Sequence, residues 1–383
     1  MRHDIVVIGG GPGGLLTANL LARRLRPDEA RIVLVDLDGR HVYRPGFLFL
    51  ALDRADSRWL ARDIRRLLRN QVELRVERAT HLDPVAGRLH LERSGSIPFD
   101  TAVLATGARL DIQSVPGFAD GAHEFYSLTG AERLREALRT WDGGRLVVGI
   151  AGMPYSCPPA PVEFALLLED HLRRTGARSR TELTFVSPIN RAFSIAPLDA
   201  FVSGLLAERG IDVRTRFDIE QIDAAGRRLH SLDGETIDYE LAVLVPPHAG
   251  ASIVVNSGLG DTGGWVPTDP SSLEVPGFEG VFAQGDATDL LISKSGSTAH
   301  FESPVIVERI VSRIRNTDPD PKRASFSGKV VCLFETGRGR ASILRLDYES
   351  APRVRRPSRL GKLATWAFHR AYWLGVPQGR FTR

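Results

Sequence analysis

The sequence of 383 residues contains only two cysteines, Cys157 and Cys332. Two cysteines are too few for the disulfide framework of a small secreted protein, and they cannot alone supply the ligands of a structural zinc site. We therefore predict no metal site and expect a cytoplasmic location, in which thiols stay reduced. The hydrophobic fraction of 43% is sufficient for an apolar core that stabilises the fold without such cross-links.

Long apolar segments are also missing. No stretch approaches the roughly 18 uninterrupted apolar residues that indicate a membrane-spanning helix. The apolar run after Arg2 and His3 is soon interrupted by glycines, so it does not predict a signal peptide. The length allows two domains and a small appendage.

The strongest pattern lies in the first thirty-six residues. An apolar run over 4–8 predicts a buried strand, a helix is predicted next, and a second apolar run over 32–35 ends at Asp36. The spacing G-x-G-x-x-G is made by Gly9, Gly11 and Gly14. These glycines permit a tight turn, the approach of a pyrophosphate and close helix packing, and the later carboxylate can bind an adenosine ribose. The pattern predicts a dinucleotide-binding domain; a glycine-rich turn in another α/β domain is the alternative.

Residues 56–68 carry apolar side chains at helical spacing, so a helix is predicted there. Strands are predicted to follow over 72–81 and 88–92. Ala79 in the first of these strands could offer its backbone to an adenine ring.

Three further segments have residue types that suit a cofactor site. A buried strand ends at Thr106 and Gly107, whose small size lets the backbone lie against a cofactor. Another strand ends at Gly285 and Asp286, and this carboxylate can accept hydrogen bonds from a sugar-alcohol chain or simply cap a turn. Lys294 precedes a predicted helix and could offer a cation to an electron-rich ring.

A second glycine fingerprint is missing where a nicotinamide dinucleotide would bind. The strand over 145–150 is followed instead by a proline-rich segment. Its prolines are Pro154, Pro158, Pro159 and Pro161. Proline has no N–H to donate to a pyrophosphate, which disfavours an NAD(P)H site. Cys157 lies ahead of a helix N-terminus that favours a thiolate, and an inert buried cysteine is the alternative. Cys332 lies in the first strand of a hairpin predicted over 328–339.

The charge is concentrated at the C-terminus. Residues 321–383 contain fourteen Lys and Arg against three Asp and Glu, a net charge of +11, so the rest of the +4 chain carries −7. Such asymmetry indicates an anionic partner, and no nucleic-acid motif accompanies it. Residues 360–374 are apolar, aromatic-rich and flanked by basic residues, which is typical of a helix in a membrane interface; a docking or dimer helix is the alternative.

These segments resemble the flavoprotein disulfide reductases that contain two dinucleotide-binding domains. The matching residues are 9–14 with Asp36, 105–107 and 285–286, over roughly the first 310 residues. Within that superfamily, residues 154–163, 294–296 and 332–337 are similar to motifs of sulfide:quinone oxidoreductase and of the flavoprotein subunit of flavocytochrome c sulfide dehydrogenase.

The resemblance implies an α/β fold with two Rossmann-like dinucleotide-binding domains, as in glutathione reductase, and a C-terminal amphipathic appendage. Residues 1–112 and 243–320 would form the FAD-binding domain. Residues 113–242 would form a second domain that carries Cys157, and 321–383 would carry Cys332 and a membrane-docking helix.

The resemblance also implies FAD-dependent oxidation of sulfide, or of a small thiol, to sulfane sulfur or polysulfide. Electrons would pass from a redox-active pair, Cys157 and Cys332, through FAD to a membrane quinone. Cys332 would lie nearer the flavin and Cys157 would carry the sulfane sulfur, with Glu163 as proton acceptor and Lys294 favouring the reduced flavin or the quinone oxygen. The expected FAD-binding residues are Gly9, Gly11, Gly14, Asp36, Ala79, Thr106, Gly107, Gly285, Asp286 and Lys294.

One departure from the family pattern is the lack of a third cysteine near residues 125–127, which favours a two-cysteine subtype. Two other functions remain open: a type II NADH:quinone oxidoreductase, and a flavoprotein subunit that donates electrons to a cytochrome. The resemblance places the protein peripherally on the inner face of the cell membrane. It leaves assembly into homo-oligomers open, and no nucleic-acid partner is expected.

Overall fold

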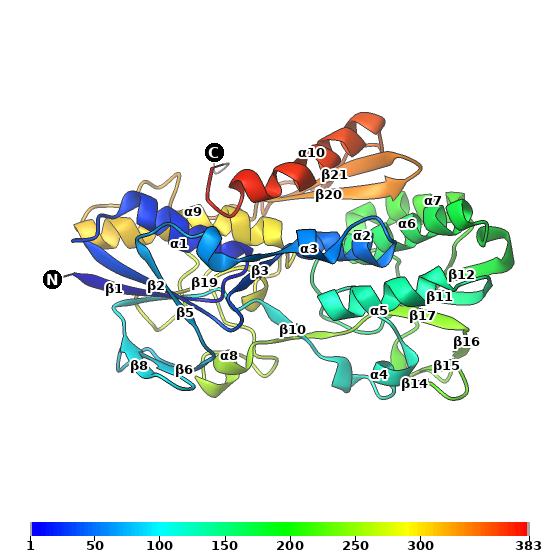
Figure 1. Cartoon of the computed structure of the whole chain (residues 1–383), viewed down its shortest axis with the longest axis horizontal. Coiled ribbons are helices and arrows are strands. Elements are labelled where there is room, and N and C mark those ends of the chain that lie inside the picture. Colours follow the sequence, from blue (N-terminus) through cyan, green and yellow to red (C-terminus); the bar gives the residue numbers. More distant parts are fainter. Residues whose placement is uncertain (1, 381–383) are drawn as a thin grey trace.

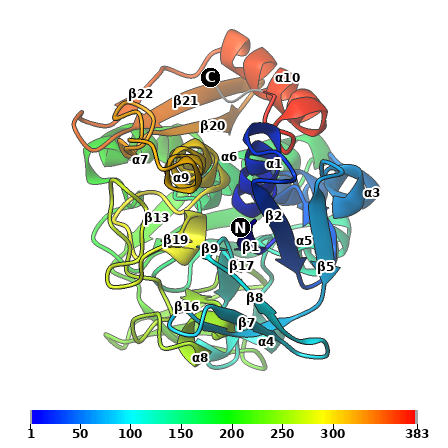
Figure 2. The same ribbon diagram turned by 90° about the vertical axis from the view of Figure 1, so that its left-hand side faces the viewer.

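A computed structural model of the chain describes residues 2–380 (Figure 1). Two sheets, each made of parallel strands, lie one after the other along the long axis of the molecule, as predicted for two Rossmann-like domains. Seen from the side, the sheets form one layer, helices α1, α6 and α9 form the next, and the C-terminal hairpin and helix lie above these helices (Figure 2).

The first sheet has the strand order β19-β9-β1-β2-β5, and all of its pairings are parallel. Its strands are β1 (His3–Ile8), β2 (Ala30–Asp36), β5 (Val72–Val76), β9 (Thr101–Leu104) and β19 (Val281–Ala283). Both faces are buried, because Ile5 of β1 belongs to one apolar cluster and Val6 to another. This explains why β1 and β2 are continuous apolar runs. Helices α1 (Pro12–Arg24) and α9 (Gly296–Arg315) pack against each other beside this sheet.

The second sheet has the order β13-β12-β11-β17 and is also parallel. Its strands are β11 (Gly144–Ile150), β12 (Thr181–Ser187), β13 (Asp212–Thr215) and β17 (Leu241–Val245). The longer helices of this part are α5 (Leu128–Arg139), α6 (Ala160–Thr175) and α7 (Asp199–Glu208). Helix α6 is buried over most of its length, since its other side is covered by the C-terminal hairpin.

Two antiparallel strands carry the chain between the sheets. Strand β10 (Ala108–Leu110) leads to the second sheet and pairs with β18 (His248–Gly250), which leads back. The domain boundaries given above stay predictions.

Short helices and small antiparallel sheets lie outside the two parallel-stranded sheets. They are α2 (Phe47–Ala51), α4 (Phe118–Gly121), α8 (Ser252–Asn256), the antiparallel sheet β6 (Ala79–Asp83), β7 (Arg88–Leu91) and β8 (Gly95–Pro98), and the antiparallel sheet β14 (Ile219–Asp223), β15 (Arg228–Ser231) and β16 (Thr236–Asp238).

The C-terminal region forms a layer of its own. Strands β20 (Val330–Gly337) and β21 (Arg340–Leu346) make a hairpin with Cys332 in its first strand, as predicted, although the second strand lies beyond the predicted range 328–339. Strand β22 (Arg353–Val354) adds to it, and α10 (Arg359–Gly375) packs on it. The chain then returns to the first domain, where Asn19 donates a hydrogen bond to the carbonyl of Pro377 (2.9 Å). Residues 381–383 of the predicted appendage lie outside the described residues.

The helix predicted over 56–68 is wrong. The segment contains a short helix α3 (Ser57–Leu60), then β4 (Ala61–Asp63), which pairs with β3 (Arg40–Val42), and a 3-10 turn over 64–66. Leu60 and Ile64 are fully buried, so the apolar spacing marks burial correctly. Pairing with β3 satisfies the backbone in place of helical hydrogen bonds.

Candidate functional site

The glycine turn after β1 forms an open cradle at the start of α1. Gly9 has a φ of 104°, which favours glycine, and a Cβ on Gly14 would lie 1.9 Å from the carbonyl oxygen of Gly9. A Cβ on Gly11 would meet nothing within 4 Å, so this side of the turn is accessible to a ligand. Helix α1 begins at Pro12 and directs its N-terminus to that space.

Asp36 lies at the end of β2, beside the same turn. Its carboxylate accepts hydrogen bonds from the backbone N–H groups of Gly10 (2.8 Å) and Gly39 (2.7 Å). Its carbonyl accepts from the N–H of Glu77 (2.9 Å), which brings the half-buried Ala79 at the start of β6 to this corner. The structure therefore gathers Gly9, Asp36 and Ala79 at one edge of the first sheet.

The ends of β9 and β19 form the next part of this edge, because the N–H of Gln284 donates to the carbonyl of Leu104 (3.0 Å). Thr106 has a buried hydroxyl with no hydrogen-bond partner among residues 2–380. Gly107 has a φ of 65°, and a Cβ there would meet nothing within 4 Å. Asp286 accepts a hydrogen bond from the hydroxyl of Ser156 (2.7 Å) and so connects the edge to the second domain.

This edge fits a dinucleotide cofactor. The turn at Gly11 is open, the unpaired hydroxyl of Thr106 is free to bond to a ligand, and the small residues leave room for one. One further group, Glu302 on α9, was missed by the sequence reasoning. It is fully buried, accepts from the N–H of Gly285 (2.5 Å), and burial raises its pKa to about 8. Only its burial in the folded chain distinguishes it from a surface glutamate.

Cys157 lies in the proline-rich loop that precedes α6. Its N–H donates to the carbonyl of Lys294 (2.6 Å), and its φ of 58° is a left-handed conformation. The backbone of Lys294 therefore contacts this loop. Its ammonium group points elsewhere: it donates to the carbonyl of Thr288 and lies 4.0 Å from the ring centre of Trp265.

Cys332 is brought to this loop by the way β20 lies along α6. Glu163 accepts a hydrogen bond from the N–H of Glu335 (2.7 Å), and Asp170 accepts one from the N–H of Arg338. Seven residues of helix advance about 10.5 Å and three residues of strand about 10 Å, so helix and strand run in register. Three residues before Glu335 on β20 is Cys332, and the loop that carries Cys157 ends where α6 begins, at Ala160. Cys332 therefore lies towards the end of α6 at which the loop of Cys157 enters, and its charge is among those that raise the pKa of Cys157; both are free thiols in this structure.

Burial governs the protonation of these groups. It raises the pKa of Cys157, and Cys332 and Glu163 raise it further. It also raises the pKa of Cys332 to about 12 and that of Glu163 to about 8, although the N–H of Glu335 lowers the latter. The prediction that the helix N-terminus favours a thiolate at Cys157 is wrong for the reduced pair, because desolvation outweighs the helix dipole.

A cavity of about 400 Å³ lies between the segment 43–59 and α10. Aromatic side chains line much of it, and Glu335 and Lys362 form an ion pair at its wall. The aromatic residues are Tyr43, Phe49, Trp59, Trp366 and His369. The pKa of Tyr43 is raised by burial and then by the charges of Tyr372 and Glu163, so this wall of the cavity lies near Glu163.

Helix α10 is anchored on one side and exposed on the other. Buried His41 lies between the carbonyl of Gly10 (2.9 Å) and the hydroxyl of Tyr372 (2.7 Å). Apolar side chains on the other side are exposed to solvent. They are Leu360 (79% exposed), Leu363 (59%), Trp366 (51%), Phe368 (41%) and Leu374 (65%). None of the helices between residues 2 and 380 combines the length and the apolar composition that a bilayer crossing demands.

Known proteins share this architecture. The family model of the pyridine nucleotide-disulphide oxidoreductases matches residues 3–303. The mitochondrial sulfide:quinone oxidoreductase of Mus musculus is 24% identical over 92% of this chain and 79% of its own, and the sulfide-quinone reductase of Aquifex aeolicus is 26% identical over 99% and 92%. A solved structure of the Aquifex aeolicus sulfide:quinone oxidoreductase superposes with a TM-score of 0.87 at 22% identity, covering 100% of this chain and 93% of that one.

A type II NADH:quinone oxidoreductase, from Mycobacterium tuberculosis, is 24% identical over 74% of this chain and 67% of its own length. The predicted family and α/β fold are confirmed by these similarities. This chain is an oxidoreductase that belongs to the pyridine nucleotide-disulphide oxidoreductase family.

Proposed function

We propose that this protein oxidises sulfide to sulfane sulfur or polysulfide through Cys157 and Cys332 and passes the electrons by way of FAD to a membrane quinone. Its relatives named sulfide:quinone oxidoreductase support this reaction. The observation that supports the proposal is that β20 is bonded along α6 and that Cys332 is near enough to Cys157 for its charge to raise the pKa of that thiol.

The oxidised pair would be a disulfide. Hydrosulfide attacks the sulfur of Cys157, the S–S bond breaks, and Cys157 keeps a persulfide while Cys332 leaves as a thiolate. The proton of the attacking hydrosulfide passes to Glu163, whose buried carboxyl group has a pKa of about 8 and so exchanges protons near neutral pH. Because burial raises the pKa of Cys332 to about 12, its thiolate is more basic and more nucleophilic than an ordinary cysteine thiolate.

FAD would be held at the edge of the first sheet by the residues predicted from the sequence, and when bound it would accept an electron pair from the thiol side and deliver it to the quinone. Gly11 leaves space for the pyrophosphate, and Thr106 offers a hydrogen bond. Lys294 acts at this site through its backbone, which holds the loop of Cys157. In this proposal its ammonium group favours the reduced flavin or the quinone oxygen.

The quinone would enter through the cavity between 43–59 and α10, whose aromatic walls suit a planar apolar ring. The exposed apolar side chains of α10 lie next to this cavity, and Lys362 and Arg370 lie on the same helix. A basic helix with exposed leucines and a tryptophan binds a bilayer interface. We therefore propose a peripheral protein at the inner face of the cell membrane.

The second candidate is a type II NADH:quinone oxidoreductase, which the relative from Mycobacterium tuberculosis favours. The proline-rich loop after β11 speaks against it, because Pro154, Pro158 and Pro159 offer no N–H to a second dinucleotide.

The test is the anaerobic absorbance of the flavin in the purified holoprotein after addition of sulfide, with NADH as the parallel donor. We expect sulfide to bleach the flavin in the wild type and not in Cys157→Ser or Cys332→Ser, and a ubiquinone analogue to restore the oxidised spectrum. Bleaching by NADH alone would assign the protein to the second candidate.

A further inference from the structure

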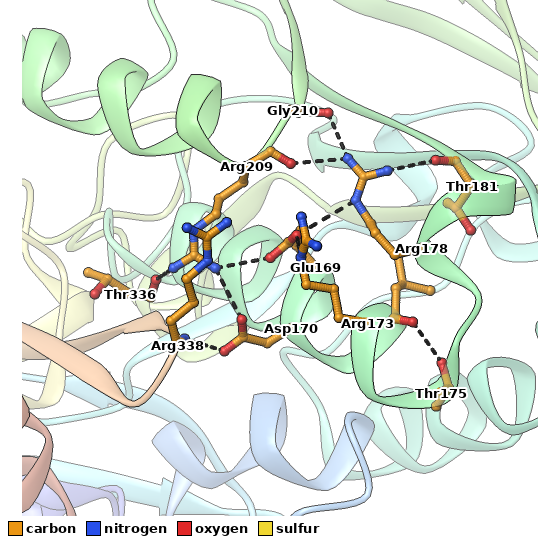
Figure 3. Close-up of polar contacts among 11 residues, drawn as sticks. Glu169, Asp170, Arg173, Thr175, Arg178, Thr181, Arg209, Gly210, Thr336 and Arg338 are labelled. Carbon is orange, nitrogen blue, oxygen red and sulfur yellow. Dashed lines mark hydrogen bonds and ion pairs between the residues drawn. The ribbon is translucent and has the colours of Figure 1, made fainter.

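A buried arginine ties the turn end of the C-terminal hairpin to helix α6 (Figure 3). Arg209 follows α7 and is only 5% exposed. Its guanidinium group donates to the carboxylates of Glu169 (2.9 Å) and Asp170 (3.0 Å) on α6 and to the carbonyl of Thr336 on β20 (2.6 Å). One side chain thus links α6 and β20 to the end of α7.

The turn of the hairpin fits closely against this group. Asp170 also accepts a hydrogen bond from the N–H of Arg338. A Cβ on Gly337, which has a φ of 72°, would lie 2.9 Å from the carboxylate of Asp170 and 3.1 Å from the guanidinium of Arg209. Glycine is therefore needed for the turn to approach α6 this closely.

The geometry points to Arg209 as a positioning residue that holds β20 in register on α6 and thereby sets the separation between Cys332 and Cys157. Cys332 lies four residues before Thr336 on the same strand, about 13 Å from the contact of Arg209. Between them, the hydrogen bond from Glu335 to Glu163 is the next point of attachment. This inference rests on the proposed function, because it assigns a role in that same cysteine pair.

The neighbouring arginines provide a contrast. Arg173 pairs with the same Glu169, yet its side chain is 54% exposed and bonds to no residue of the hairpin. Arg178 donates to the carbonyls of Thr181, Arg209 and Gly210 and so supports the backbone around Arg209. A cavity of about 570 Å³ opens beside these arginines. Their donors are largely taken by groups of the chain itself, so we assign the cluster to positioning and not to an anionic ligand.

The experiment measures the distance between the two thiols without using catalysis. The reduced, FAD-loaded full-length protein is treated with dibromobimane, which joins two thiols only when they are within a few ångströms, and the cross-linked peptides are identified by mass spectrometry. We compare the wild type with Arg209→Met, Arg209→Lys and the matched control Arg173→Gln. Circular dichroism and flavin content establish that each variant is folded.

We expect the wild type and Arg173→Gln to cross-link at equal rates. Arg209→Met should cross-link about tenfold more slowly, because removal of a buried ion-pair partner leaves Glu169 and Asp170 without it. Arg209→Lys keeps the positive charge but loses the planar set of N–H donors, so its cross-linking rate should lie between those of the wild type and Arg209→Met. A tenfold loss in the effective concentration of the thiols would also make the disulfide of the pair easier to reduce by about 30 mV.

Gly337→Ala provides a second test should Arg209→Met fail to fold. It moves the turn of the hairpin away from α6 without changing any charge, and we expect the same slower cross-linking. Equal rates in the wild type and both Arg209 variants would overturn the positioning role while leaving the proposed function intact. Equal slowing in Arg173→Gln would overturn it too, since general loss of charge would then be the cause. Failure of the wild type to cross-link would overturn the cysteine pair itself, and with it both proposals.

Discussion

Replacing Glu163 by Gln should make the protein more stable at alkaline pH and impair sulfide oxidation. Burial raises the pKa of Glu163 from 4.5 to about 8. Between these two values the folded state holds a proton that the unfolded state has released, so the free energy of unfolding falls as the pH rises from 4.5 to 8. Above pH 8 both states are ionised, and the loss is complete.

The size of this loss follows from the shift. A difference of about 3.5 pH units corresponds to about 5 kcal/mol at 1.36 kcal/mol per unit. Local relaxation and water penetration reduce the effective penalty, so we expect Glu163→Gln to be about 2–4 kcal/mol more stable than the wild type at pH 8.5 and equally stable at pH 4. Glutamine keeps an oxygen that can accept the hydrogen bond from the N–H of Glu335, so the packing of β20 is preserved.

The assay is urea unfolding of both proteins at a fixed FAD concentration at pH 4, 7 and 8.5. Glu302 also has a pKa raised to about 8, but it titrates equally in both proteins and cancels from their difference. Glu302→Gln is the matched control and should show a similar gain in stability. A difference between the wild type and Glu163→Gln that stays constant with pH would refute the reasoning.

The rate of flavin reduction, unlike stability, should distinguish the role of Glu163 from that of Glu302. Glu163→Gln should reduce the rate of flavin reduction by sulfide about a hundredfold, because the proton acceptor is lost. Glu302→Gln, which lies at the other end of the site beside Gly285, should change this rate far less.

Three other predictions follow from named contacts. Cys157→Ser and Cys332→Ser should each abolish flavin reduction by sulfide while binding FAD normally, and loss of FAD in either would contradict the separation of the two sites, as measured by flavin absorbance. Gly14→Ala should prevent folding with FAD because its Cβ would lie 1.9 Å from the carbonyl of Gly9, whereas Gly11→Ala should fold and only weaken FAD binding, as fluorescence titration would show. Leu363→Gln, at a side chain that is 59% exposed, should weaken binding to anionic vesicles without lowering Tm, and unchanged co-sedimentation would argue against the membrane role of α10.

The local chemistry of the chain is sufficient to predict much of the first domain. A buried strand, a glycine turn and a helix follow one another within a few residues, and each is defined by its own side chains and backbone freedom. The strand that carries Cys332 and a helix over 360–374, observed as α10 over 359–375, were predicted for the same reason. The helix over 56–68 was wrong because its apolar spacing records burial, and pairing of β4 with the distant β3 decides the backbone.

The sequence by itself determined that the chain has a dinucleotide turn at Gly9, a proline-rich loop at Cys157 and a basic apolar tail, because each is a property of neighbouring residues. Only the tertiary structure decided the register of β20 on α6, the bonds of Arg209 and the burial that raises the pKa of Glu163 and Cys157. The register of β20 and the bond from Arg209 to Thr336 join residues more than a hundred positions apart, and the raised pKa values depend on the exclusion of water. No local pattern encodes the contacts between distant residues or the exclusion of water, since both arise when separate elements pack together.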